Sequence, residues 1–189
     1  MRIVGIVCSP RKGGNTEILV REALDAIQEL GGETELITVS DKTINPCDGC
    51  NTCVKEGVCR INDDMQGIYH QLLQSDGIIL GTPVYFINVS AQAKAVMDRT
   101  YVFLRQRELM SKVAGAIVVA RRVGAGQVRS LLYSYFMAHR MLVAGSAIGY
   151  GRGKGEVREG PGGALGTSAL EEARGLGRAV VSLYKQLSR

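Results

Sequence analysis

Four of the five cysteines in this chain lie within thirteen residues, in the spacing C-x2-C-x2-C-x5-C: Cys47, Cys50, Cys53 and Cys59. Iron–sulfur clusters are bound by four thiolates that come from compact runs of this kind. The two-residue gaps let consecutive thiolates face one centre, and Gly49 and Gly57 permit the tight backbone turns of such a loop. The spacing therefore favours a 4Fe–4S cluster with these four cysteines as ligands. Cys8 lies outside the run and is not expected to be a ligand.

Three other states of these cysteines stay open on the sequence alone. Structural zinc also takes four thiolates, although its usual pattern is two C-x2-C pairs separated by a longer spacer. Disulfides would need an oxidising compartment, to which nothing else in the chain points. The third state is reduced thiols without any ligand.

A chain of 189 residues is long enough for one domain with a sizeable core, so we expect a single domain over residues 1–189. The composition, 46% hydrophobic and 22% charged, is that of an ordinary globular protein. No apolar run approaches the roughly 20 residues that cross a bilayer, and the apolar run after Met1 is too short for a signal peptide. We expect a cytoplasmic protein without a membrane partner, whose thiols stay reduced.

The formal net charge of +5 does not by itself indicate nucleic-acid binding. No helical segment carries a basic face interleaved with aromatic residues, and only 5% of the residues are aromatic. Small basic groups occur at Arg11–Lys12, Arg121–Arg122 and Arg152–Lys154. Anionic cofactors or an acidic protein partner account for these groups better than a nucleic acid does.

Apolar segments alternate with helical patterns along the whole chain. We expect strands at residues 2–7, 34–39, 77–81, 113–120 and 142–148. Residues 2–7 are apolar on both faces and residues 77–81 are all apolar, like the buried strands of a parallel sheet. Helices are expected to end at Gly31, to begin near Asp63 and Ser90, to cover about 128–141, and to follow a cap at Thr167 or Ser168. The alternation predicts an α/β fold with a doubly wound, five-stranded parallel sheet in the order 2-1-3-4-5.

Two long loops interrupt this pattern. The cysteine loop, residues 44–62, follows the second strand, and a glycine-rich loop over residues 149–166 follows the fifth and is expected to be mobile. In a doubly wound sheet, ligands bind outside the carboxyl ends of the strands, where the strand order reverses. The loops after strands one, three and four are therefore expected to lie along one edge. The cysteine loop after strand two is expected to emerge along that same edge, which would place the cluster beside the ligand crevice.

The loop from Ser9 to Thr16 leads from the first strand into a helix N-terminus, where backbone amides and the helix dipole favour an anion. Ser9, Asn15 and Thr16 supply neutral donors, and Arg11 supplies a positive charge. The loop matches neither G-x-G-x-x-G nor a Walker motif, which argues against a dinucleotide or ATP here. The alternative is an ordinary turn whose helix is capped by Asn15 or Thr16.

These residues carry a family resemblance. Ser9-Pro10-Arg11-Lys12-Gly13-Gly14-Asn15-Thr16 resembles the FMN-phosphate loop of flavodoxin-like NADPH-dependent FMN reductases, and Asp63-Asp64-Met65 and Gly81-Thr82-Pro83-Val84-Tyr85-Phe86 are also similar to that family. With the cysteine run after the second strand, the chain resembles the iron–sulfur flavoproteins of anaerobic archaea and bacteria over about residues 1–150.

The resemblance implies one FMN and one 4Fe–4S cluster per subunit of a homo-oligomer, either a dimer or a tetramer, with the cluster of one subunit near the FMN of another. It places the FMN phosphate at Ser9, Arg11, Asn15 and Thr16. It places the isoalloxazine ring beside Pro83, Val84, Tyr85 and Phe86, with help from Asn88. A third flavin loop would comprise Arg121, Gly124, Gly126 and Gln127, although its Gly-Ala-Gly departs from the usual glycine pair. For Tyr85 and Phe86, packing under the following helix is the alternative.

The resemblance implies an FMN-dependent oxidoreductase that transfers electrons between a low-potential donor, such as ferredoxin, and an acceptor. No protein acid or base is needed, because the cofactors carry the chemistry. The alternative is an NAD(P)H-dependent FMN or quinone reductase whose cysteines bind zinc or no metal. A third hypothesis, from a different class, is a zinc-stabilised binding module without flavin.

Overall fold

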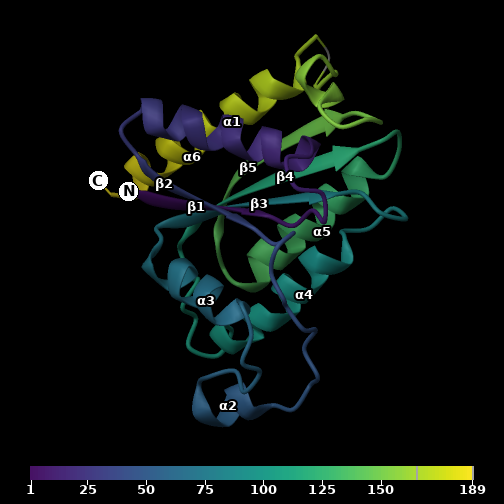
Figure 1. Ribbon diagram of the computed structural model, residues 1–189. Coiled ribbons are helices and arrows are strands. Elements are labelled where there is room, and N and C mark those ends of the chain that lie inside the picture. The colour runs from purple at the N-terminus through teal and green to yellow at the C-terminus, as the bar shows by residue number, and fades with distance from the viewer. Residues whose placement is uncertain (165, 189) are drawn as a thin grey trace.

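Five parallel strands form a single sheet in the computed structural model, which describes residues 1–164 and 166–188. The strands are β1 (Arg2–Val7), β2 (Glu33–Thr38), β3 (Gly77–Pro83), β4 (Val113–Ala120) and β5 (Leu142–Tyr150). They pair in the order β2-β1-β3-β4-β5, all in parallel (Figure 1). The predicted doubly wound α/β sheet is confirmed. Leu165, in the expected glycine-rich loop, and Arg189, at the end of the expected domain, lie outside the described residues.

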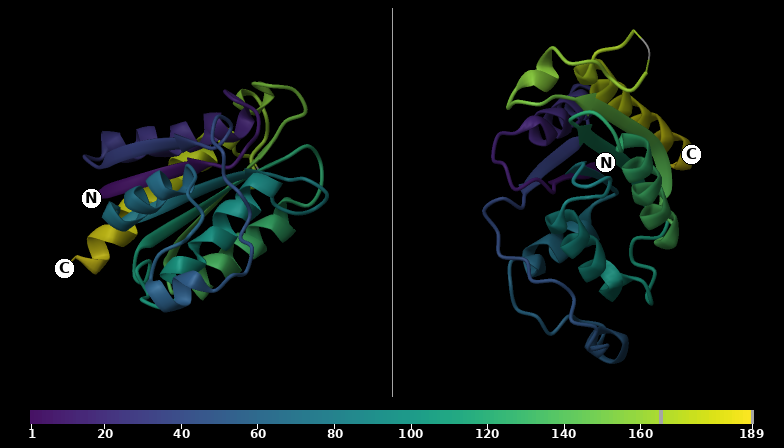
Figure 2. Two further views of the ribbon diagram at one scale, coloured as in Figure 1. Left: turned by 60° about the horizontal axis from the view of Figure 1, so that its bottom comes forward. Right: turned by 90° about the vertical axis from the view of Figure 1, so that its right-hand side faces the viewer.

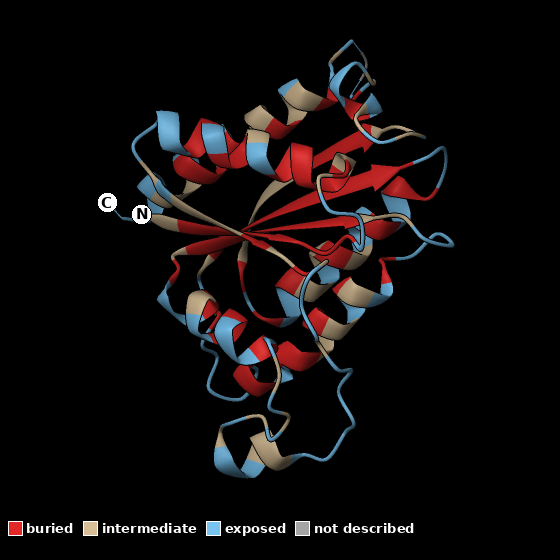
Figure 3. Cartoon of the chain, viewed as in Figure 1, coloured by how far each residue is buried: buried red, intermediate tan, exposed pale blue. Residues whose placement is uncertain are grey.

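Helices cover both faces of the sheet. α1 (Asn15–Glu29) and α6 (Ala169–Leu187) lie on one face, and α3 (Met65–Gln74), α4 (Ala91–Arg99) and α5 (Ala125–Ala138) lie on the other (Figures 1 and 2). The apolar side chains of each helical layer form one core cluster against the sheet. β1, β3 and β4 are therefore buried on both sides, as their continuous apolar sequences require (Figure 3).

The layer of α1 and α6 depends on one close backbone approach. Gly177 of α6 lies so near α1 that a Cβ added to it would overlap the carbonyl oxygen of Ala23 and come within 3.0 Å of the Ala26 Cβ. The glycine allows the two helices to pack at this short separation. Gly175, one half-turn earlier on α6, has open space around it apart from Arg178.

Most predicted boundaries hold, and the differences have local causes. β3 and β5 each run two residues further than expected, because Thr82 and Pro83 pair with β4, and Gly149 and Tyr150 also pair with β4. Pro83 fits there because it is the last residue of its strand. α5 begins at Ala125, three residues earlier than predicted. Ser90 caps α4 and Ser168 caps α6, each accepting a bond from a backbone amide of the first turn.

Short helical turns occur where only loops were expected. α2 (Thr52–Glu56) forms the tip of the cysteine loop, η1 (Thr100–Phe103) extends α4, and η2 (Glu156–Arg158) lies in the glycine-rich loop. The buried side chain of Val157 anchors that last loop in the core cluster of α1 and α6. Of the helices in the described residues, none is long and apolar enough to cross a membrane.

Candidate functional site

The loop between β1 and α1 is built to leave the start of α1 open to a ligand. The Gly13 amide donates to Glu17 Oε2 (2.7 Å), the Gly14 amide to the Arg11 carbonyl (3.2 Å), and the Arg11 amide to Ser9 Oγ (3.2 Å). Gly13 has a φ of +63°, which glycine adopts without strain. These bonds fold the loop tightly in front of the helix.

The N-terminus of α1 has no side-chain cap among the described residues, since its N-cap residue is Gly14. The alternative interpretation required Asn15 or Thr16 to cap the helix. Neither does, because both are residues of its first turn. The first amides of α1 are therefore available to an anion. The nearest carboxylate is Glu17: burial raises its pKa, but hydrogen bonds from Arg21 and the Gly13 amide outweigh burial and hold that pKa below its usual value.

The loop after β3 makes a tight turn that presents its tip to solvent. The amide of each of Tyr85 and Asn88 donates to the carbonyl of the other, at 2.9 and 3.0 Å, with Phe86 and Ile87 at positive φ between them. Phe86 is fully exposed and Tyr85 is exposed, so neither packs under the following helix. Asn88 Oδ1 accepts from the Val89 amide (2.8 Å), which holds the turn.

A cavity of about 260 Å³ opens at the carboxyl ends of β1, β3 and β4. We call it the flavin cavity, because it brings together most of the residues that were predicted to bind FMN: Ser9, Arg11, Asn15, Thr16, Pro83, Val84, Tyr85 and Arg121. Five predicted residues do not line it: Phe86, Asn88, Gly124, Gly126 and Gln127. Of these, Gly124 packs against Val84 and Ile87 and so supports the loop after β3 from behind.

The flavin cavity also contains residues that the motifs did not identify. Gly151, Arg152 and Lys154 reach it from the glycine-rich loop. A second cavity, of about 570 Å³, adjoins it and shares Val84, Arg121 and Arg152; its other lining residues are Phe86, Ile87, Arg122 and Val123. The three basic groups noted in the sequence thus converge on one edge of the sheet. Their clustering in the sequence was the signal that pointed to an anionic ligand.

The cysteine loop leaves the carboxyl end of β2, at the expected edge of the sheet, but does not stay beside the flavin cavity: it projects beyond α3 and α4, with α2 at its tip (Figures 1 and 2). Gly49, Asn51 and Gly57 adopt positive φ, which bends the chain on both sides of α2. A cavity of about 240 Å³ lies inside the loop, and all four cysteines of the run line it: Cys47, Cys50, Cys53 and Cys59. Tyr101 and Val102 close the cavity from η1.

The four thiols surround a volume instead of converging on a point. Among the described residues, no three or more His, Cys, Asp or Glu side chains stand in an arrangement that could hold a metal ion. The thiols are nevertheless close enough to affect one another: burial, and then the neighbouring Cys59, Cys47 and Cys50, raise the pKa of Cys53. No cysteine in the described residues forms a disulfide. Four thiols that line one cavity are a donor set that can hold an iron–sulfur centre.

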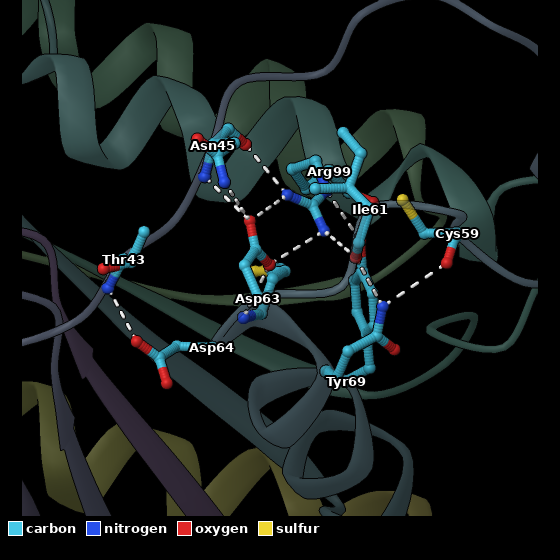
Figure 4. A network of polar contacts seen from close by, with 10 residues as sticks. Thr43, Asn45, Cys59, Ile61, Asp63, Asp64, Tyr69 and Arg99 are labelled. Atoms are coloured by element: carbon cyan, nitrogen blue, oxygen red, sulfur yellow. Dashed lines mark hydrogen bonds and ion pairs between the residues drawn. The ribbon is translucent and has the colours of Figure 1, made fainter.

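One buried side chain, that of Arg99 at the end of α4, joins the two ends of the cysteine loop (Figure 4). Its Nη1 donates to the Asn45 carbonyl (2.9 Å), where the loop begins, and its Nη2 donates to the Ile61 carbonyl (3.2 Å), where the loop ends. Asp63 pairs with the same guanidinium, and its Nε donates to the Tyr69 hydroxyl (3.2 Å). Arg99 also lines the cysteine cavity, so it links the cavity to the protein core.

The flavin cavity and the cysteine cavity have no lining residue in common. The first lies at the carboxyl edge of the sheet, whereas α2 lies beyond the helices that cover one face of it (Figure 1). Each site is therefore built by a separate set of loops.

Known proteins show similarity to this chain over its whole length. The model of a family described as NADPH-dependent FMN reductase matches residues 1–154. An iron–sulfur flavoprotein of Methanocaldococcus jannaschii is 41% identical over 199 aligned residues, which cover 100% of both chains. An iron–sulfur flavoprotein of Archaeoglobus fulgidus is 35% identical and covers 100% of this chain and 83% of its own. A solved WrbA-like flavodoxin from Agrobacterium tumefaciens has a TM-score of 0.63 at 18% identity, covering 98% of this chain and 97% of its own.

Proposed function

Because the chain belongs to the iron–sulfur flavoproteins of the NADPH-dependent FMN reductase family, we propose that it carries electrons from a low-potential donor such as ferredoxin to an acceptor. It is an FMN-dependent oxidoreductase by its family. When both groups are bound, FMN exchanges one or two electrons and a 4Fe–4S cluster exchanges one, so the pair connects one-electron and two-electron partners. We place the protein in the cytoplasm, where thiolates are available to iron.

The observation that carries this proposal is the cavity inside the cysteine loop. Four thiols of one short segment line a volume of about 240 Å³ and are not gathered around a single ion position. Zinc draws its four ligands to one tetrahedral point, with Zn–S distances of about 2.3 Å. The geometry therefore supports a 4Fe–4S cluster with Cys47, Cys50, Cys53 and Cys59 as its ligands.

The residues of the flavin cavity suit FMN in two ways. At the phosphate end, the uncapped amides of α1, the hydroxyls of Ser9 and Thr16 and the guanidinium of Arg11 favour an anion. At the other end, Pro83, Val84 and Tyr85 provide apolar surface for a planar ring. The role of these residues is to bind and orient the flavin.

The separation of the two cavities supports a homo-oligomer in which the redox pair spans two subunits. The cysteine loop points away from its own flavin cavity, and exposed apolar side chains lie beside each site: Val58 and Tyr101 near the cysteines, Phe86 and Ile87 near the flavin. Exposed apolar side chains at both sites are what an interface between copies would cover. We propose that the cysteine loop of one subunit lies at the flavin cavity of another.

Anaerobic reconstitution with iron, sulfide and FMN tests the function. We expect about four iron atoms and one FMN per chain, as the ligand set implies, and reduction of the bound flavin by reduced ferredoxin. Replacing ferredoxin with NADPH should give much slower reduction. Protein that binds flavin but acquires no iron or sulfide under these conditions would overturn the proposal.

A second function, reduction of FMN or quinones by NAD(P)H, is favoured by one observation. The cavity beside the flavin cavity is lined by Arg121, Arg122 and Arg152, which could bind the phosphate groups of a dinucleotide. Rapid anaerobic bleaching of the flavin by NADPH, in protein whose four cysteines are replaced, would support this function over the ferredoxin-dependent one.

A further inference from the structure

The glycine-rich loop brings positive charge to the flavin cavity. Arg152 and Lys154 line that cavity together with Ser9, Arg11 and Thr16. The Lys154 ammonium lies against the loop after β1, since its Nζ is 3.3 Å from the position that a Cβ on Gly13 would take. Residues from opposite ends of the chain therefore share one side of this cavity.

The side chain of Asn15 fixes the position of Lys154. Asn15 Nδ2 donates to the Gly153 carbonyl (2.9 Å), and its Oδ1 accepts from the Gly155 amide (2.7 Å). The two bonds hold the backbone on either side of Lys154. Because Asn15 is the first residue of α1, they attach the glycine-rich loop to the helix terminus that favours an anion.

Val157 anchors the same glycine-rich loop on the side that faces α1 and α6. Its side chain is fully buried in the apolar cluster that includes Leu19 of α1 and Ala169 of α6. The loop is thus held by an apolar contact and by two hydrogen bonds, and the exposed side chains of Arg152 and Lys154 extend from this support into the cavity.

The charges around the cavity are not neutralised by the protein. Within residues 1–164 and 166–188, none of Arg11, Arg152 and Lys154 forms an ion pair with a carboxylate. Of the carboxylates in the two loops and the first turn of α1, Glu17 has another partner, whereas Glu156 bonds the backbone of Arg152 and offsets part of the positive charge of Arg152 and Arg121. Glu17 pairs with Arg21 (2.8 Å), and Glu156 accepts from the Arg152 amide (2.6 Å). A net positive charge is therefore left for a ligand.

We propose that Lys154 and Arg152 bind the phosphate of FMN, so that the glycine-rich loop makes the site select FMN over riboflavin. A phosphomonoester carries about −1.5 to −2 charges at neutral pH, which is more than Arg11 alone neutralises. The inference rests on one part of the proposed function, which is that the flavin cavity binds FMN. It extends the phosphate site from the loop after β1 to a loop outside the motif.

The test is a titration of flavin-free protein, of full length, with FMN and with riboflavin. Lys154→Gln and Arg152→Gln each remove one charge from the cavity, and Lys12→Gln and Arg158→Gln remove one charge from the same two loops outside it. We expect Lys154→Gln to weaken FMN binding about tenfold, as the loss of one charge-assisted hydrogen bond does. The riboflavin affinity of Lys154→Gln should change by less than about twofold. The affinities of the control variants for FMN and for riboflavin should change as little.

Two further variants separate charge from loop packing. Lys154→Arg should retain the preference for FMN, because it retains the charge. In an Asn15→Ala background the loop is released, so adding Lys154→Gln should weaken FMN binding less than it does in the parent. Equal losses of FMN and riboflavin affinity in Lys154→Gln, or FMN affinity equal to that of Lys12→Gln, would overturn the inference.

These outcomes are independent of electron transfer. A parent protein that selects FMN through Lys154 but accepts no electrons from ferredoxin would refute the proposed function and leave this inference standing. A parent that transfers electrons normally, with Lys154→Gln indistinguishable from Lys12→Gln, would refute this inference alone.

Discussion

Arg99 and Asp63 form a two-pronged ion pair inside the protein, with Nη1–Oδ2 and Nη2–Oδ1 distances of 2.8 and 3.0 Å. Their side chains are 0% and 3% exposed. The same guanidinium bonds the carbonyls of Asn45 and Ile61, so the pair holds both ends of the cysteine loop together. Removing one partner would leave a buried charge without compensation, which typically costs about 3–5 kcal/mol.

The first prediction concerns acid stability. Burial raises the pKa of Asp63, but the hydrogen bonds from Arg99 and the amides of Asn45 and Met65 outweigh burial and lower it from 3.8 to about 2. A lowered pKa means that Asp63 stabilises the fold above the unfolded-state value and loses that effect as the pH falls toward about 2. In Asp63→Asn, the free energy of unfolding should be lower at pH 7 and should depend less on pH between about 5 and 2. Urea titrations of cluster-free protein measure both effects.

The matched control is Asp64→Asn, because Asp64 is exposed and its carboxylate bonds the Thr43 amide instead of Arg99. We expect it to change the unfolding free energy by less than about 0.5–1 kcal/mol at any of these pH values. Parallel pH profiles for the parent and Asp63→Asn would show that this ion pair does not control acid stability.

The second prediction concerns the cysteines. Replacing any one of Cys47, Cys50, Cys53 or Cys59 with Ala should remove most of the cluster and leave FMN bound, because the two cavities are separate. Cys8→Ala should retain both groups. Cys8 is fully buried away from the run, and burial raises the pKa of its thiol, so it stays protonated. Iron, sulfide and flavin analyses decide the matter, and loss of the cluster in Cys8→Ala would show that the ligand set is wrong.

The third prediction concerns the phosphate loop. Arg11→Glu should weaken FMN binding by about tenfold or more, because it replaces a positive charge in the cavity with a negative one. Lys12→Glu makes the same charge change on a neighbouring exposed residue that does not line the cavity, and it should have a smaller effect. Fluorescence titration gives the two dissociation constants. Equal FMN affinity in Arg11→Glu and the parent would remove Arg11 from the site.

The fourth prediction concerns the proposed pairing of sites across subunits. A Cys50→Ala chain keeps its flavin cavity, and an Arg11→Glu chain keeps its cysteine cavity. Mixed oligomers of the two should regain electron transfer from cluster to flavin that neither parent variant shows. Stopped-flow reduction of the flavin measures this recovery. Verified mixed oligomers that stay inactive would rule out transfer between subunits.

The fifth prediction uses two glycines of α6. Gly177→Ala should destabilise the protein by about 1–3 kcal/mol, because the added Cβ overlaps the Ala23 carbonyl oxygen and the two helices must separate. Gly175→Ala should be neutral or stabilising by up to about 1 kcal/mol, since alanine favours a helix and the space there is open. The difference in urea midpoint measures this contrast. A destabilisation of similar size in both variants would show that the close approach of Gly177 to α1 is not the cause.

The strand order and the strand–helix junction at Ser9 to Thr16 were predictable from sequence because both depend on local patterns. Buried strands of continuous apolar residues require helices on both faces, and Ser9 to Thr16 lies at a strand–helix junction whatever the rest of the chain does. Ser90 and Ser168 were recognisable as caps for the same reason.

Contacts between distant segments were not predictable in this way. Arg99 is an ordinary residue of an amphipathic helix in the sequence, and only the fold places it between Asn45 and Ile61. The glycine-rich loop was expected to be mobile because glycine weakens local preferences, whereas Asn15 and Val157 attach it to α1 and to the core. Asn88 was expected at the flavin, but the structure directs its side chain to the Val89 amide.

The bonds from Arg99 that join the two ends of the cysteine loop have a consequence for changes in the length of that loop. A single side chain joins the carbonyls at Asn45 and Ile61, while inside the loop the Val54 carbonyl accepts from Arg105 and Cys53 and Cys59 pack against the core. The entropy of closing a loop grows only logarithmically with its length, so residues can be added to or deleted from the interior at little cost to the host. We therefore expect a change of length inside the loop to cost the fold less stability than the loss of the bonds at its two ends.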